Sequence, residues 1–183
     1  QRRKCAILKS ACIEKYNKIQ GGNQNGAKRI RDFGIVPGRV KTGERNAITD
    51  VPGIRVGHCT VKTEENHTGV TVIVPGPDNA FAKHYTAAAY IHNGFGKSAG
   101  VVQVEELGTL ETPIALTNTL NVGKVLDAMV EIVIEQCRKD GIEPQSINPV
   151  VGECNDCRIN HIQKRAIGEK EVREAFALAS EEF

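Results

Sequence analysis

The sequence predicts an α+β layered fold, because strand patterns fill its first half and helix patterns its second. Residues 54–61 and 69–74 are β-branched runs bounded by glycine and proline, which is typical of strands. From Val122 onwards, apolar residues instead recur every three to four positions, as they do on the buried face of a helix. Strands followed by long helices favour packed layers of sheet and helix. A chain of 183 residues is long enough to bury such a core.

The N-terminal segment is distinct in composition from the rest of the chain. Residues 4–19 place apolar side chains at helical spacing, and the run GGNQNG at 21–26 reads as a flexible linker. We therefore predict a helix and a Gly/Asn linker over residues 1–27, followed by a main domain over 28–183. Lys9 and Glu14 interrupt any apolar region of a signal peptide, so the protein is expected to stay in the cytoplasm.

The strands of the main domain follow in order. A turn at 66–69 should join the first two strands, and the run PGPDN at 75–79 should end the second. Further strands are predicted at 88–92, 99–104 and 113–117.

The helices come next along the chain. The pattern from Val122 to Cys137 predicts a helix with Thr119 or Asn121 as its N-cap and Gly141 as its stop. A short strand at 150–151 and a helix at 170–182 complete the prediction. If the rest of a larger fold packs on that last helix, the helix should expose an apolar face.

Charge and apolar content exclude two classes of partner. The 24 basic residues nearly balance the 22 acidic ones, so no electrostatic argument favours nucleic acid. No apolar run approaches the roughly 20 residues that a bilayer span needs. In a cytoplasmic protein the six cysteines would be reduced thiols.

The glycine-rich loop at 93–100, NGFGKSAG, superficially resembles a dinucleotide-binding loop. Its glycine spacing is one residue too long for that fingerprint, and the sequence predicts a strand rather than a helix after it. Two readings remain open: a glycine-rich turn, or a loop whose backbone lies close to a bound substrate.

Cys154, Cys157 and His161 could offer three zinc ligands. A structural zinc needs a fourth ligand, and only His58 or Cys59 could supply it from far away in the sequence. A single C-x-x-C pair is weak evidence for metal. We therefore predict no metal and no cofactor, and two reduced thiols in a loop.

Small polar side chains gather where a strand should meet a helix, in the run LTNTLNVG at 116–123. Such hydroxyl and amide groups are suited to holding a polar substrate, whereas helix capping would account for only one or two of them. Asn160 is similarly open to two readings. Its amide could donate to an oxyanion, or it could simply make a turn.

Several of these runs together resemble a known family. Residues 28–61, KRIRDFGIVPGRVKTGERNAITDVPGIRVGHCTV, resemble the opening of the L-aminopeptidase D-Ala-esterase/amidase and β-aminopeptidase family. The blocks at 93–108, 116–123 and 151–160 match it in order, so the resemblance covers about residues 28–165. It implies a four-layer α/β/β/α sandwich resembling N-terminal-nucleophile hydrolases with different connectivity, present here only in part.

The resemblance also implies a function. Family members cut themselves into two chains, and the new N-terminal Ser or Thr attacks an amide bond. This chain would be the N-terminal chain of such an aminopeptidase or amidase, inactive alone, with the nucleophile beyond it. Its partners would be the C-terminal chain of the same precursor, a small peptide or amide substrate, and further copies in a homo-oligomer.

Residue roles carry over by position. Asn160 looks like the oxyanion-hole asparagine, so we expect Asn160→Ala to lower kcat strongly while leaving folding intact. The substrate pocket would be lined by residues of the loops and of the predicted strand end: Tyr90, Asn93, Gly94, Lys97, Thr117 and Asn118.

One departure leaves the substrate open. Several aminopeptidase members carry an acidic residue for the substrate amine where this chain has Lys97. An amide-oligomer hydrolase with a Thr nucleophile, an acyltransferase of the same fold, and a non-catalytic ligand-binding relative therefore remain alternatives.

Overall fold

The computed structural model describes residues 30–92 and 94–182. Its contacts divide the chain into two units, Gln1–Lys41 and Thr42–Phe183. In the first unit, the described part contains a 3-10 helix at Ile30–Phe33, and Arg31 donates to the carbonyl of Pro37 at 2.9 Å. The helix and linker predicted for residues 1–27 lie outside the described residues. Their boundary with the main domain stays a prediction.

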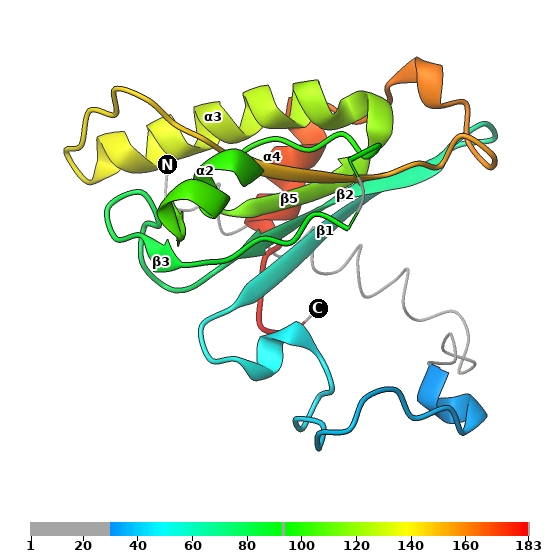
Figure 1. Ribbon diagram of the computed structural model, residues 1–183. Coiled ribbons are helices and arrows are strands. Elements are labelled where there is room, and N and C mark those ends of the chain that lie inside the picture. The colour runs from blue at the N-terminus through cyan, green and yellow to red at the C-terminus, as the bar shows by residue number, and fades with distance from the viewer. Residues whose placement is uncertain (1–29, 93, 183) are drawn as a thin grey trace, which may run out of the picture. The chain divides into compact units, whose positions relative to one another are not determined.

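The second unit is built on a four-stranded sheet in the order β1-β2-β5-β6 (Figure 1). Strands β1 (Arg55–Lys62) and β2 (His67–Val74) form an antiparallel hairpin. Strand β5 (Ile114–Asn118) pairs antiparallel with β2, and β6 (Val150–Cys154) pairs parallel with β5. The strands predicted near these positions are confirmed. A separate two-stranded sheet joins β3 (Tyr85–Thr86) to β4 (Thr109–Leu110).

Two helices cover one face of the larger sheet: α3 (Val122–Lys139) packs on β5 and β6, and α4 (Glu169–Ala177) packs on β1 and β2 (Figure 1). Their apolar stripes meet the sheet in one core, which includes Val72, Ala115, Met129, Val151 and Val172. This layering confirms the fold class that the change of hydrophobic period predicts.

The ends of α3 follow directly from the sequence. Gly141 takes a φ of 70°, and the N–H of Ile142 donates to the carbonyl of Cys137 at 2.9 Å. This is the glycine-dependent C-terminal motif that leaves the last helical carbonyls satisfied. The predicted stop at Gly141 is therefore confirmed. At the other end, a 3-10 turn at Thr119–Asn121 precedes the helix, and the side chain of Asn121 makes no capping hydrogen bond.

Close packing of α4 depends on a glycine in β1. A Cβ atom at Gly57 would overlap the backbone carbonyl of Ala175 and lie 2.8 Å from the nitrogen of Ala179. Glycine thus lets the helix backbone rest directly on the strand.

The opposite face of the sheet is open among the described residues. Leu116 is 44% exposed although β5 lies between two other strands, and His58 and Thr60 are exposed on β1. The apolar residues of α4, in contrast, face the sheet, with Val172 and Ala175 fully buried. The exposed apolar surface expected on the last helix therefore occurs on the sheet instead.

Two predicted strands are wrong. Residues 88–92 form no strand; they are exposed on both sides, and β-propensity has little effect without a neighbouring strand. Residues 99–104 contribute only an isolated bridge between Ala99 and Val151 before helix α2 (Val101–Leu107) begins. Gly100, in the left-handed conformation, makes that change of direction possible.

Two predicted boundaries are also wrong. The register pairs Lys62 with His67, so the hairpin turn spans residues 63–66 rather than 66–69. The last helix ends at Ala177 because Ser180 leaves it to pair with Val56, through backbone hydrogen bonds of 2.9 and 3.1 Å.

Candidate active site at the carboxyl ends of β5 and β6

A cluster of buried and half-buried polar side chains lies at one edge of the four-stranded sheet. Because β5 and β6 are parallel, their carboxyl ends meet there, and the amino end of the antiparallel strand β2 joins them. We call this group the strand-end cluster; it consists of Thr68, Thr117, Asn118, Thr119, Asn121, Glu153, Asp156 and Asn160. Segments far apart in the sequence thus bring their polar groups to one place.

The carboxylate of Asp156 lies at the centre of the cluster. Its Oδ2 accepts hydrogen bonds from Thr68 Oγ1 at 2.8 Å, Asn160 Nδ2 at 2.8 Å and Asn118 Nδ2 at 3.3 Å. Its Oδ1 is buried and has no hydrogen-bond partner among the described residues. One carboxylate oxygen therefore ties together β2, β5 and the loop after β6.

Asn160, which is 7% exposed, joins that loop to the start of β2. Its Oδ1 accepts from the backbone N–H of His67, and its Nδ2 donates to the carbonyl of His67 at 3.1 Å. With the bond to Asp156, both amide hydrogens have acceptors. An oxyanion could receive one of them only by displacing a present partner. The oxyanion role stays a prediction.

The polar residues after β5 bond to one another and to the neighbouring strands. Thr117 Oγ1 donates to the carbonyl of Gly69 at 3.3 Å, and Asn118 Nδ2 donates to Thr68 Oγ1 at 3.1 Å. Asn121 is fully buried and contacts Asn118 in either orientation of its amide. Helix capping therefore does not explain this run, because none of these side chains caps α3.

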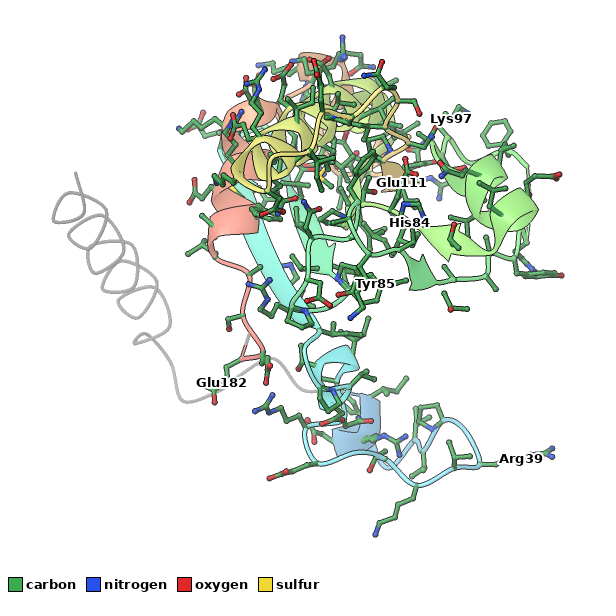
Figure 2. The ribbon with its side chains drawn as sticks, turned by 90° about the vertical axis from the view of Figure 1, so that its left-hand side faces the viewer. Arg39, His84, Tyr85, Lys97, Glu111 and Glu182 are labelled. Carbon is green, nitrogen blue, oxygen red and sulfur yellow. The ribbon has the colours of Figure 1, made fainter. Side chains whose placement is uncertain are left out.

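Glu153 connects the cluster to the glycine-rich loop. Thr119 Oγ1 donates to its Oε2, and the backbone N–H of Lys97 donates to its Oε1 at 3.1 Å. The Lys97 side chain, labelled in Figure 2, folds back instead: Nζ donates to the carbonyl of Phe95 at 2.9 Å and lies 4.1 Å from the centre of its ring. The loop backbone is thus held at the cluster by a charged acceptor.

The structure brings together only part of the predicted site. Thr117, Asn118 and Asn160 lie in the cluster, and Lys97 reaches it through its backbone. Gly94 is exposed in the same loop, and Asn93 lies outside the described residues. Tyr90 is 87% exposed, and its ring contact is with His92.

The glycine loop needs one correction. A helix, α2, follows it, where the sequence predicts a strand. The exclusion of a dinucleotide fingerprint then depends on glycine spacing alone. That spacing still differs by one residue, and a seven-residue helix is short for the purpose.

Sequence reasoning missed Thr68, Glu153 and Asp156 as members of the cluster. Asp156 stands inside the motif CNDC, for which the sequence predicts two reduced thiols in a loop and no role for the aspartate. Its spacing of four residues from Asn160 was the available signal, since the N–H of Asn160 donates to the Asp156 carbonyl at 3.1 Å. Over the described residues, no group of three His, Cys, Asp or Glu side chains is placed to hold a metal ion.

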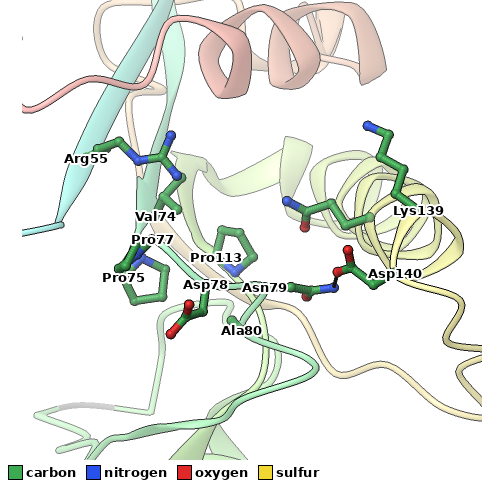
Figure 3. A pocket seen from close by; sticks show the side chains of 11 residues that line it. Arg55, Val74, Pro75, Pro77, Asp78, Asn79, Ala80, Pro113, Lys139 and Asp140 are labelled. Atoms are coloured by element: carbon green, nitrogen blue, oxygen red, sulfur yellow. Dashed lines mark hydrogen bonds between the residues drawn. The ribbon is translucent and has the colours of Figure 1, made fainter.

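A hollow beside the sheet lies away from this cluster. A cavity of about 220 Å³ opens at the other end, where β2 ends and β5 begins, and is lined by Arg55, Pro113, Asn79, Asp140 and neighbours (Figure 3). It contains none of the predicted site residues. Concavity and chemistry therefore point to opposite ends of the sheet. We place the site at the strand-end cluster, because buried and half-buried polar groups converge there from three strands.

None of the described helices combines the length and the apolar character needed to cross a membrane.

Known structures share this arrangement. The chain superposes with a TM-score of 0.79 and 38% identity on the PH0078 protein from Pyrococcus horikoshii, covering 85% of this chain and 47% of that one. It also matches L-aminopeptidase D-Ala-esterase/amidase from Ochrobactrum anthropi with a TM-score of 0.74 and 29% identity, over 85% of this chain and 45% of that one. That enzyme is described as a prototype for the serine aminopeptidases and a new variant of the Ntn-hydrolase fold. The fold is thus that of Ntn-hydrolase-like aminopeptidases, seen in part.

The family follows from sequence. The model for peptidase family S58 matches residues 46–183, and the chain belongs to this family. It is also 36% identical to the β-peptidyl aminopeptidase BapA of Sphingosinicella xenopeptidilytica over 143 residues. These aligned residues make up 73% of this chain and 35% of that protein. The chain spans about a third of that relative and less than half of each matched structure.

Proposed function

We propose that this chain is the N-terminal chain of a self-cleaving aminopeptidase or amidase that hydrolyses amide bonds of small peptides or amides. One observation carries the proposal: a buried amide cluster lies at the edge of a sheet whose second face is open, in a chain about half as long as the family structures it matches. The nucleophile, an N-terminal Ser or Thr, would lie beyond residue 183. A cytoplasmic location agrees with the four described cysteines, which are free thiols.

The proposed chemistry divides one difficult step into two. Self-cleavage frees an α-amine beside the hydroxyl, and this amine, with an ordinary pKa of about 7.7–8.0, removes the hydroxyl proton near neutral pH. The oxygen attacks the amide carbonyl, and an Asn160 amide hydrogen stabilises the negative oxygen. The leaving amine takes the proton. Water then attacks the ester, which releases the acid and restores the hydroxyl.

The open face of the sheet favours the proposal that a partner chain covers it. Leu116 exposes 44% of its surface at the centre of the sheet, an unusual place for a leucine without a covering layer. We assign that layer to the C-terminal chain of the same precursor, which would complete the α/β/β/α sandwich. Assembly into a homo-oligomer remains part of the proposal and has no support in the described contacts.

Lys97 bears on the choice of substrate. Its ammonium is paired with a backbone carbonyl and an aromatic face in the loop that Glu153 holds at the cluster. A cation here would repel the free amine of a peptide, which favours an amide-oligomer hydrolase or an acyltransferase of the same fold as the second candidate.

Intact mass and N-terminal sequencing of the protein expressed from its full-length gene test the proposal. We expect two chains, the second of which begins with Ser or Thr. A single uncleaved chain would contradict self-cleavage and favour a non-catalytic, ligand-binding relative.

A further inference from the structure

We infer that Asp156 is a positioning residue for the proposed reaction, because its carboxylate fixes the side-chain amides of Asn160 and Asn118 at the sheet edge. The inference rests on the proposed function. It adds a residue that neither the sequence analysis nor the comparisons single out.

Three hydrogen-bond donors converge on one oxygen atom of Asp156. Asp156 Oδ2 accepts from a hydroxyl on β2, an amide at the end of β5 and the amide of Asn160, at 2.8, 3.3 and 2.8 Å. Hydrogen bonds to an ionised acceptor are roughly twice as strong as neutral ones. The donors that the described residues supply to this carboxylate therefore all bind Oδ2.

Asp156 also holds Asn160 through its backbone. The carbonyl of Asp156 accepts from the N–H groups of Ile159, at 3.0 Å, and Asn160, at 3.1 Å. The turn therefore places the Asn160 side chain back over the carboxylate that precedes it by four residues. The backbone of His67 holds the other side of the same amide. Asn160 has little freedom to rotate while all these bonds persist.

The hydroxyl of Thr68 serves as both a donor and an acceptor within the cluster. It donates to Asp156 at 2.8 Å and accepts from Asn118 at 3.1 Å. The carboxylate thus sets the direction of the Thr68 proton, which leaves a lone pair for Asn118. Removing the charge should loosen both asparagines together.

The test uses the full-length protein with Asp156→Asn, which keeps the shape and removes the charge. We expect kcat per cleaved molecule to fall about 10- to 100-fold, the order associated with a misplaced catalytic group. KM should rise by a smaller factor than kcat falls, because Asn160 would act on the negative oxygen of the transition state, whereas Asn118 is one of several groups that would line the pocket. Asp140→Asn is the matched control, since this exposed carboxylate accepts from Asn79 at 2.7 Å at the other end of the sheet.

A double variant separates positioning from a general effect on the fold. If Asp156 acts through Asn160, Asp156→Asn should lower kcat by less than about twofold when added to Asn160→Ala. Full additivity would overturn the inference, as would an unchanged kcat in Asp156→Asn or an equal loss in Asp140→Asn. If Asp156→Asn does not fold, Thr68→Val removes one donor to the same carboxylate and is expected to lower kcat in the same way; an unchanged kcat there overturns the inference.

Self-cleavage is followed by intact mass in the same preparations. If Asp156→Asn melts like the wild type but stays uncleaved, the rate of self-cleavage is compared in place of kcat. Self-cleavage serves this purpose because it also requires attack on an amide carbonyl. Wild-type rates of both cleavage and turnover would overturn the inference. A wild-type protein that neither cleaves itself nor hydrolyses amides would instead contradict the proposed function.

Discussion

The two ends of the four-stranded sheet contain the same pair of residue types in different surroundings. Each end contains an asparagine that bonds to an aspartate: Asn160 to Asp156 at the carboxyl ends of β5 and β6, and Asn79 to Asp140 at the opposite end. Asn160 is buried and its aspartate gathers two further donors, whereas Asp140 is exposed. The cavity lies at the second end and the converging polar groups at the first. Local chemistry, more than hollow space, marks the candidate site here.

Replacing the two asparagines by alanine should separate the ends most clearly. In the full-length protein, Asn160→Ala is expected to lower kcat about 10²- to 10³-fold, the usual cost of one oxyanion donor. Asn79→Ala should leave kcat unchanged within about twofold, because the bonds it removes, to Asp140, Cys137 and the N–H of Phe81, all lie away from the cluster. Steady-state kinetics on a small amide substrate measures both. Equal losses in the two variants would show that the ends do not differ in function.

The structure adds a stability cost to Asn160→Ala. The change removes the Asn160 bonds to the N–H and the carbonyl of His67 and one of the three donors to Asp156 Oδ2, at a cost on the order of 0.5–1.5 kcal/mol per bond. The expectation that this variant folds intact therefore needs a melting curve beside the kinetics. The measured fall in kcat should be larger than the fall that the unfolded fraction of the variant at the assay temperature could explain.

The cysteines offer a second comparison of the same ends. Cys154 and Cys157 are exposed beside the strand-end cluster, whereas Cys137 is buried near the other end, where burial raises the pKa of its thiol. In the core between them, burial and the nearby Glu174 raise the pKa of the Cys59 thiol from 9.0 to about 11. A two-unit rise makes the reactive thiolate roughly 100-fold scarcer.

We therefore expect a thiol-specific maleimide at pH 8 to label Cys154 and Cys157 at least about 100-fold faster than Cys59. Peptide mass mapping over time assigns each modified residue, and labelling in denaturant serves as the control in which all cysteines react. Protection of Cys154 and Cys157 in the native full-length protein would show that another part of it covers this loop.

The sequence predicts most of the fold because its signals are local. The 3.6-residue period from Val122, the glycine at 141 and the β-branched runs of β1 and β2 each determine structure within a few residues. The prediction for residues 99–104 is wrong because the run contains a glycine in the left-handed conformation and opens a seven-residue helix, too short for a clear period. The end of α4 depends on Ser180 pairing with Val56, a contact between distant segments.

The candidate site likewise combines residues that a local sequence signal predicts with residues that only contacts between distant segments bring in. Asn118 and Asn160 stand out in the sequence because amides at a strand end or in a loop can serve a substrate. Thr68 and Glu153 have no such signal. They join the cluster through the pairing of β2 with β5 and of β5 with β6, which is decided by the register of the whole sheet.

The smallest expected effect concerns the open face of the sheet and its contribution to the pH dependence of stability. His58 lies on the open face, 2.8 Å from Thr71 Oγ1, and partial burial lowers the pKa of its ring below the ordinary 6.5. Between that lowered pKa and 6.5 the unfolded chain binds more protons than the folded one, so stability rises with pH and is lost as pH falls. Melting temperatures of the full-length protein from pH 7.5 to 5.5 should therefore fall slightly more for the wild type than for His58→Gln. Equal slopes would show that the histidine of the open face makes no contribution in this range, and that the pH response comes from other parts of the molecule.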